Sequence, residues 1–140
     1  MDSETANKIC SLDSNQKIFD YVVNFMSSQG KPSIDAAGDC VYYGPNNLRC
    51  AVGCLILPDE YKSSFDENQE DIGKLTDSIP RFEGYEDILS RLQYFHDDME
   101  HWADTCGLLS SSENDSPFSV SGKNYLNKIA LELNLNCLLD

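Results

Sequence analysis

The chain has 140 residues, the usual size of one domain, and carries a formal net charge of -14 from 24 acidic and 10 basic residues. This excess of carboxylates repels phosphate backbones and anionic lipid surfaces, so direct nucleic-acid binding and membrane binding are disfavoured. No apolar run reaches the roughly 18 residues of a membrane span, and the acidic N-terminus lacks the apolar segment of a signal peptide. We therefore expect a cytoplasmic protein.

The first long helix is the clearest signal in the N-terminal part of the chain. Residues 1–13 are polar, so we expect a flexible N-terminus ahead of a single globular domain over residues 14–140. Ser14 fits a helix N-cap, apolar residues follow it at helical spacing, and Gly30 ends the pattern. These signals predict a helix over about 15–28.

Turn signals and apolar signals follow each other closely in the next part of the chain. Residues 40–43 are β-branched and aromatic, residues 44–47 read Gly-Pro-Asn-Asn, and residues 48–50 can return as a second strand. This order predicts a short β-hairpin. The apolar run 51–57 predicts a short buried helix, in which Gly53 lets another backbone segment approach closely.

The rest of the chain contains two further helical patterns. Residues 62–84 are acidic and broken by glycine and proline, so we expect irregular structure with a helical turn near 69–75. An amphipathic helix is predicted over about 85–105 and a last helix over about 122–134. The apolar stripe of the first of these two consists of Ile88, Leu92, Phe95, Met99 and Trp102. The predicted fold class is mainly α (α+β), with three longer helices packed with the short β-hairpin and the short buried apolar helix.

The cysteines favour free thiols over disulfides. Their spacing is irregular, no signal peptide is expected, and several of them lie inside apolar runs. Buried thiols in a reducing compartment fit these observations. The six cysteines are Cys10, Cys40, Cys50, Cys54, Cys106 and Cys137.

Cys50 is the candidate nucleophile of a cysteine-dependent hydrolase or transferase. It lies where the hairpin is expected to enter the buried helix, and a helix N-terminus lowers the pKa of a thiol. In this alternative His96 acts as the base and Asp97 or Asp98 orients it. Neighbouring side chains on a helix diverge, however, so Asp97 is poorly placed for that role. The competing interpretation is that Cys50 packs in the core and His96 lies on the flank of its helix.

A structural zinc site is a second alternative. Cys50 and Cys54 share one face of a helix, and together with His96 they would offer three zinc ligands. His96 and His101 are five residues apart and share no helix face, and the sequence has no Cys-x-x-Cys pair. The chain also lacks the glycine-rich motifs that bind nucleotides, so we expect no cofactor.

Carboxylates line the polar side of the helix predicted over 85–105. On a rigid helix such a row can imitate the phosphates of DNA and occupy a protein groove lined by lysine and arginine. The alternative is a solvated helix face that serves only solubility. The candidate partner-binding residues are Asp97, Asp98, Glu100, Asp104, Glu86 and Asp87.

Two segments resemble the motifs of a family of small uncharacterised phage and prophage proteins. Residues 40–42 match its Cys-x-Tyr, and residues 44–46 match its Gly-Pro-Asn. Residues 50–56 match its Cys-Ala-Val-Gly-x-Leu-Ile, and residues 92–97 match a later Leu-Gln-x-x-His-Asp. The chain departs from the pattern at Asn47, where the family has glycine.

The resemblance implies a viral or mobile-element source and brings no enzymatic activity with it. The leading interpretation is therefore an accessory protein in the host cytoplasm that binds and inhibits or redirects a host protein, such as a defence or DNA-binding protein. Counter-defence through an acidic DNA-mimicking face is its narrower form. A homo-oligomer also stays open, because aromatic residues in turn-rich regions are common interface anchors. The aromatic residues concerned are Tyr42, Tyr43, Tyr61, Phe65 and Phe82.

Overall fold

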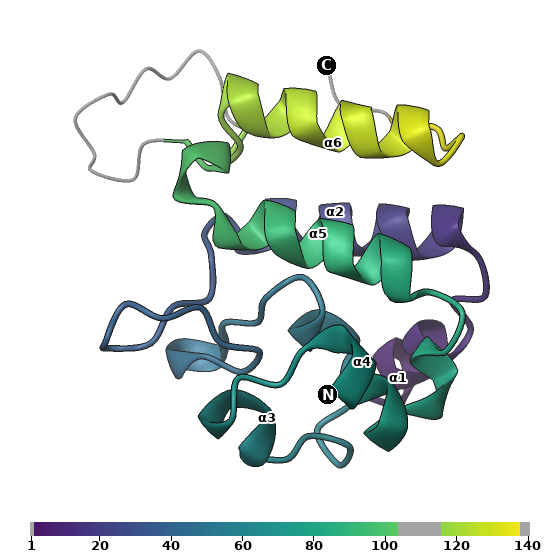
Figure 1. The fold of residues 1–140 in the computed structure, drawn as a ribbon, viewed down its shortest axis with the longest axis vertical. Coiled ribbons are helices and arrows are strands. Elements are labelled where there is room, and N and C mark those ends of the chain that lie inside the picture. The colour runs from purple at the N-terminus through teal and green to yellow at the C-terminus, as the bar shows by residue number, and fades with distance from the viewer. Residues whose placement is uncertain (1, 104–115, 138–140) are drawn as a thin grey trace.

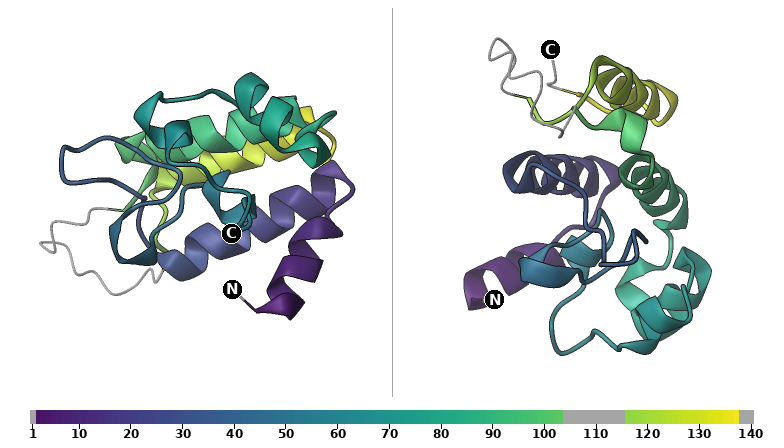
Figure 2. Two further views of the ribbon diagram at one scale, coloured as in Figure 1. Left: turned by 90° about the horizontal axis from the view of Figure 1, so that it is seen from below. Right: turned by 90° about the vertical axis from the view of Figure 1, so that its left-hand side faces the viewer.

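The computed structural model describes residues 2–103 and 116–137, and it is mainly α-helical, as predicted. Its long helices are α2 (Asn15–Gln29), α5 (Glu86–Asp97) and α6 (Val120–Glu132). Helices α2 and α5 lie side by side, α6 covers them on one side, and shorter helices and loops lie on the other side (Figure 1; Figure 2). No helix in the described ranges combines the length and the apolar composition needed to cross a bilayer.

Helix α2 begins and ends close to where the sequence predicted. The Ser14 side chain accepts a hydrogen bond from the Lys17 N–H at 3.1 Å, which satisfies one free amide of the first turn. At the other end Gly30 takes a left-handed conformation (φ 81°), and its N–H donates to the Met26 carbonyl at 2.9 Å. The buried face of α2 consists of Ile18, Phe19, Val22, Val23 and Met26.

The N-terminal segment contains a helix where the sequence predicted no regular structure. Helix α1 spans Ser3–Cys10, and the Asp2 carboxylate caps it by accepting the Thr5 N–H at 2.8 Å. Its one buried residue, Ile9, is 1% exposed and lines a small cavity together with Ile18 and Leu55. The few apolar side chains of this polar segment are a weak sequence signal, which explains the difference.

The predicted β-hairpin is wrong. Residues 40–50 turn back on themselves, but in the described part of the chain they form no strand, and the only pairing within this turn is an isolated bridge between Tyr43 and Arg49. The turn itself contains the short 3₁₀ helix η1 (Pro45–Asn47). Asn47 has a φ of 64°, a left-handed conformation that asparagine tolerates better than most residues. This conformation explains how asparagine fits the turn at this position.

Competing hydrogen bonds prevent the bridge from growing into a strand pair. The Cys50 N–H donates to the Tyr42 carbonyl, but an antiparallel ladder also needs the reverse bond from the Tyr42 N–H to the Cys50 carbonyl. The Tyr42 N–H instead donates to the Asp66 carboxylate at 2.7 Å. The Cys50 carbonyl accepts from the Cys54 N–H at 3.0 Å, which starts a helical turn.

The apolar run after the turn is buried, with only a short helical segment. The 3₁₀ helix η2 spans Gly53–Leu55, so the helix is shorter than the one predicted over 51–57. The close backbone approach predicted at Gly53 is confirmed, because a Cβ at this position would lie 2.0 Å from the Tyr42 carbonyl oxygen. Glycine therefore allows the segment to pack directly against the preceding turn.

The acidic segment 62–84 is more regular than predicted. It forms the helices α3 (Ser64–Glu67) and α4 (Ile72–Ser78) and the 3₁₀ helix η3 (Pro80–Phe82). Its apolar residues are buried, namely Phe65, Ile72, Leu75, Ile79 and Phe82. Tyr42 is buried as well, and Tyr43 and Tyr61 are partly buried and stack on each other with ring centroids 4.0 Å apart. These aromatic residues thus contribute to the core of the single chain rather than to an exposed patch.

Helix α5 ends at Asp97, well before the predicted end near 105. Asp98 is extended (φ -93°, ψ 112°), and its carboxylate accepts the Glu100 N–H, which starts the 3₁₀ helix η4 (Met99–His101). Met99, predicted to belong to the apolar stripe, is 47% exposed. Trp102 is buried without continuing the helix, because its indole N–H donates to the His96 carbonyl at 3.0 Å.

Candidate functional site

Three groups of chemical interest meet at the C-terminal end of α5. His96 and Asp97 are its last two residues, and Cys40 lies on the loop that precedes the turn, where it forms a bridge with Ile34. A ring nitrogen of His96, a carboxylate oxygen of Asp97 and the Cys40 sulfur all lie within 4.8 Å of one another. The structure therefore places Cys40, not Cys50, beside His96 and Asp97.

The hydrogen bonds of His96 fix the tautomer of its neutral ring. The ring is fully buried, and the Ser33 N–H points at Nε2 with a distance of 2.9 Å between the two nitrogens. Nε2 is therefore the acceptor, and the proton of the neutral ring is on Nδ1, which lies 2.9 Å from Asp97 Oδ1. The expectation that Asp97 is poorly placed to orient His96 is wrong, because at the end of the helix the Asp97 carboxylate turns back to its neighbour.

This arrangement does not provide a general base for a thiol. The His96 Nδ1–H donates a hydrogen bond to Asp97, and the lone pair of Nε2 accepts one from the Ser33 N–H. No ring nitrogen is left to accept a proton from Cys40 or Cys50. The orientation that a catalytic dyad needs is therefore missing from the site.

The thiols themselves are not activated. Burial raises the pKa of Cys50 to about 12, although the Gly53 N–H partly offsets this by donating to its sulfur at 3.2 Å. Burial, the charge of Asp97 and a hydrogen bond to Asp97 raise the pKa of Cys40 to about 12. The pKa of Cys54 is also raised by burial. The lowered pKa expected at Cys50 is thus wrong, because desolvation outweighs any helix-terminus effect.

The same hydrogen bonds work against a metal ion in the cluster. A metal on Nδ1 of His96 would displace its proton, and the neutral ring would then carry a proton on Nε2, facing the Ser33 N–H. Within the described residues, the zinc candidates Cys50, Cys54 and His96 do not form such a cluster. The sulfur of Cys50 accepts from Gly53, and the Cys54 thiol donates to the Ala51 carbonyl at 3.1 Å.

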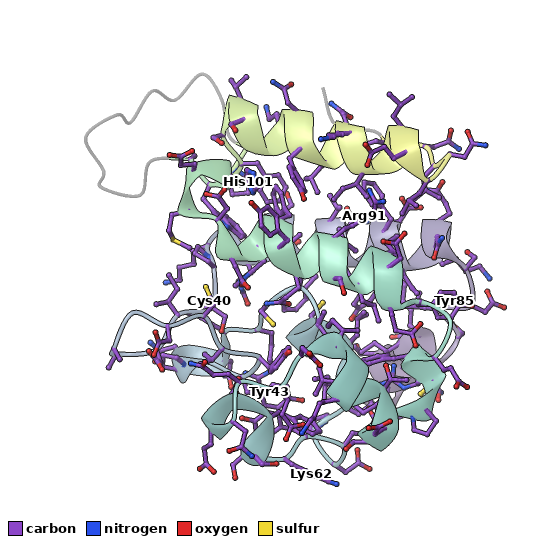
Figure 3. The ribbon with its side chains drawn as sticks, in the orientation of Figure 1. Cys40, Tyr43, Lys62, Tyr85, Arg91 and His101 are labelled. Atoms are coloured by element: carbon purple, nitrogen blue, oxygen red, sulfur yellow. The ribbon has the colours of Figure 1, made fainter. Side chains whose placement is uncertain are left out.

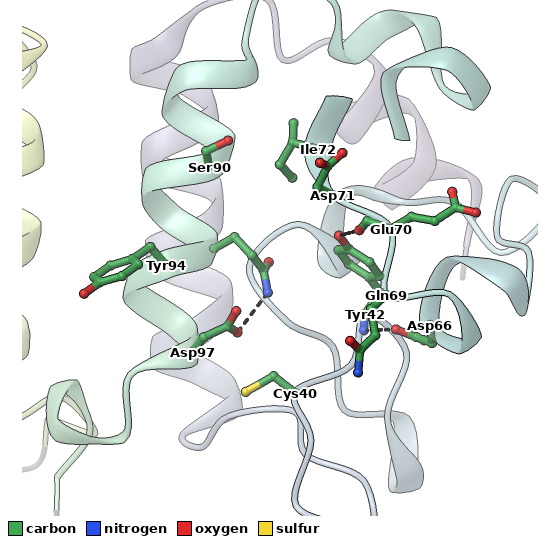
Figure 4. A pocket seen from close by; sticks show the side chains of 11 residues that line it. Cys40, Tyr42, Asp66, Gln69, Glu70, Asp71, Ile72, Ser90, Tyr94 and Asp97 are labelled. Atoms are coloured by element: carbon green, nitrogen blue, oxygen red, sulfur yellow. Dashed lines mark hydrogen bonds between the residues drawn. The ribbon is translucent and has the colours of Figure 1, made fainter. Parts of the chain in front are cut away.

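A cleft of about 450 Å³ opens beside this cluster (Figure 4). One wall is a single face of α5, with Ser90, Gln93 and Asp97 at helical spacing. The opposite wall is the segment 66–72, and Tyr42 and Cys40 lie between the two walls. The Tyr42 hydroxyl donates to the Glu70 carbonyl and so ties the base of the cleft to this second wall.

The charged side chains that line the cleft are all carboxylates. Asp66, Glu70, Asp71 and Asp97 line it, although the Glu70 carboxylate points away from α5 (Figure 4), and no lysine or arginine is among the described residues of its lining. Asp66 is held by three donors, the Tyr42 and Tyr43 N–H groups and the Tyr61 hydroxyl. These acidic residues are part of the net charge counted from the sequence. Nothing in their spacing, however, predicted that the segment 66–71 lies opposite α5.

The predicted partner-binding face is divided into two groups at opposite ends of α5. Glu86 and Asp87 lie in the first turn and Asp97 in the last, roughly 16 Å apart along the axis. Arg91, labelled in Figure 3, forms an ion pair with Asp87 at 3.0 Å. Of the predicted residues that the structure describes, only Asp97 lines the cleft.

The other members of that face have local roles or lie elsewhere. The Glu86 carboxylate accepts the Gly84 N–H at 2.8 Å, and Asp98 caps the turn that contains Glu100. Glu100 is exposed. Asp104 lies outside the described residues. The described residues therefore form no continuous row of carboxylates along α5.

The two segments that carry the family-like motifs contact each other. Gln93 accepts the Val52 N–H at 3.1 Å and donates to Asp97 at 3.0 Å. Cys40 from the first motif meets His96 and Asp97 from the second. The motif residues thus hold the turn region against α5 and shape one end of the cleft.

Comparison with known proteins gives no relative on which to base the site. No family model matches the chain, no curated protein matches its sequence, and no solved structure matches its fold.

Proposed function

We propose that this chain is a non-enzymatic protein that binds a protein partner through its acidic cleft. The observation that carries the proposal is a cleft of about 450 Å³ whose charged side chains are all carboxylates. Pockets of this size are typical of binding sites. The engaged nitrogens of His96 and the raised pKa values of Cys40 and Cys50 support a binding role over cysteine catalysis.

The partner we propose is a host protein that the chain inhibits or redirects, in the manner of a counter-defence inhibitor. The support for a host partner is the resemblance of residues 40–56 and 92–97 to a phage family, together with the small size and the net charge of -14. A DNA-mimicking face is the narrower form of this proposal. It requires that the partner binds DNA and that DNA competes with this chain for it.

A tagged pull-down from host lysate tests the proposal. We expect one dominant protein at about 0.1 M salt and its loss at about 0.5 M salt, because the attraction between exposed charges is screened. Capture of the same protein at both salt concentrations would contradict an electrostatic mode of binding. A folded protein that captures nothing under either condition would contradict the binding function itself.

A further inference from the structure

We infer that the cleft receives a lysine or arginine side chain of the protein partner. This inference rests on the proposed function and adds the chemistry of the group that is bound. The cleft is a two-walled concavity between α5 and the segment 66–72, and it remains open with the side chains of both walls in place. A long cationic side chain can enter such a space from a partner surface.

The carboxylates of the cleft are held in position before any ligand arrives. Asp66 is fixed by two backbone N–H groups and a tyrosine hydroxyl, and Asp71 caps α4 by accepting the Lys74 N–H at 3.0 Å. Asp97 accepts from Gln93 and His96. Binding therefore requires little ordering of these acceptors, which improves affinity for a complementary group.

In the part of the chain that the structure describes, no lysine or arginine forms an ion pair with the carboxylates of the cleft. The groups that hold Asp66 and Asp97 are N–H and O–H donors of neutral groups, not ammonium or guanidinium groups. The Asp97 side chain is also 43% exposed, so part of its carboxylate faces the solvent. An entering cation would meet acceptors on both walls, which is the charge complementarity that selects a basic partner.

A metal ion fits the cleft less well than an organic cation. Among the described residues, the cluster whose ligand atoms lie close enough for one ion includes Asp97 but neither Asp66 nor Asp71. That cluster depends on His96, whose nitrogens are both engaged. Carboxylates on separate walls suit the several donors of an ammonium or guanidinium group.

The test uses the full chain and small probes followed by NMR. Acetyl-arginine-amide and acetyl-lysine-amide carry the proposed cations, and acetyl-citrulline-amide is the neutral analogue of the first. The side-chain amides of Gln69 and Gln93 line the cleft and serve as reporters. We expect saturable shifts of both reporters with the two cationic probes and none with the citrulline probe.

Two variants with matched controls locate the binding. Ser90 is exposed and lines the cleft, so Ser90→Tyr should fill it and abolish the saturable shifts, whereas Ser121→Tyr on α6 should not. Asp71→Asn keeps a side-chain oxygen for the cap of α4 and should weaken binding about two- to fivefold, as expected for one partly solvated charge pair. Glu67→Gln removes the same charge from an exposed residue outside the cleft and should leave binding unchanged.

The outcomes separate this inference from the proposed function. Equal weakening by Asp71→Asn and Glu67→Gln, or shifts that spread without saturation, would overturn the cleft as the site. The inference would also fail if Ser90→Tyr still captured the partner in the pull-down, and the binding function would then stand. Saturable probe binding without any captured partner would support the cationic site and contradict the protein partner.

Discussion

Among the described glycines, Gly53 is the one at which an added Cβ would lie nearest to another atom. A Cβ on Gly53 would lie 2.0 Å from the Tyr42 carbonyl oxygen, which is backbone and has little freedom to move away. We expect Gly53→Ala to lower the free energy of unfolding by roughly 1–3 kcal/mol, the usual cost of overpacking. Urea unfolding measures this change.

Gly73 provides the matched control for that substitution. It lies inside α4, and a Cβ there would be 3.5 Å from Asp71 Oδ1, an ordinary contact. Gly73→Ala should therefore raise the free energy of unfolding by about 0.5–1 kcal/mol, since alanine favours a helix. Similar losses at Gly53 and Gly73 would show that the contact with Tyr42 is not the cause.

The Cys50 thiol makes stability depend on alkaline pH. Its pKa is about 12 in the folded protein and 9.0 as the ordinary value, so between these values the unfolded chain loses a proton that the folded chain keeps. Its contribution to stability is complete below pH 9.0 and is lost as the pH rises toward 12. The free energy of unfolding should fall by about 1.4 kcal/mol per pH unit in this window because of this thiol.

Urea unfolding of the parent protein and of Cys50→Ala at about pH 8 and about pH 10.5 checks this prediction, since only the parent carries the thiol. The stability advantage of the parent should shrink at the higher pH. Parallel pH profiles for the two proteins would contradict a raised pKa at Cys50.

At the scale of elements, helix α2 uses side-chain amides to hydrogen-bond backbone groups that a sheet would otherwise pair. The Gln29 side chain at the end of α2 donates to the Arg49 carbonyl at 2.8 Å and accepts the Arg49 N–H at 2.9 Å. Gln16 at the start of α2 pairs in the same way with the Asn136 backbone. Helix α2 thus holds the turn region at one end and the segment after α6 at the other.

These two glutamines allow a comparison within one helix. The Gln29 contacts with Arg49 are partly buried and those of Gln16 are exposed. We expect Gln29→Ala to lower the free energy of unfolding by about 1–3 kcal/mol, because buried backbone groups lose their partners. Gln16→Ala should cost less, because water replaces its bonds. Equal thermal unfolding midpoints for both variants would contradict this ranking.

The elements also show which structural signals the sequence contains. Both ends of α2 were predictable, because Ser14 and Gly30 act locally. The end of α5 was not, because Trp102 continues the helical spacing but is buried through a hydrogen bond to the His96 carbonyl. The hairpin failed for a similar reason, since Asp66 takes the Tyr42 N–H from a distance of 24 residues. Sequence patterns report local preferences and not such long-range partners.

The candidate site shows the same division between local and distant signals. His96 and Asp97 were candidates from their residue types, and the close approach at Gly53 followed from the missing side chain. Cys40 and Asp66 were missed as partners, because nothing in their spacing connects them to α5. The hydrogen-bond donor to His96 Nε2 could not be found from the sequence, since it is the backbone N–H of Ser33.

At the scale of the whole molecule, the net charge of -14 opposes folding by self-repulsion. We expect the thermal unfolding midpoint to rise when salt increases from about 0.01 M to about 0.3 M, because the Debye length becomes shorter than the molecule. Calorimetry measures the midpoint. A variant that neutralises the exposed residues Glu67, Asp77 and Glu83 should respond less to salt. An equal response in both proteins would show that salt acts on something other than repulsion.

Two long-range contacts beside the cleft influence the order in which the protein folds. Ser33 and His96 are 63 residues apart, and Val52 and Gln93 are 41 residues apart, so both contacts close long loops. Loop closure of this kind is slow compared with helix formation, and we expect the cleft to form after the folding transition state. Gln93→Ala should then speed unfolding and leave the folding rate nearly unchanged in stopped-flow measurements. The part of the molecule proposed to bind is thus the part that assembles last and opens first.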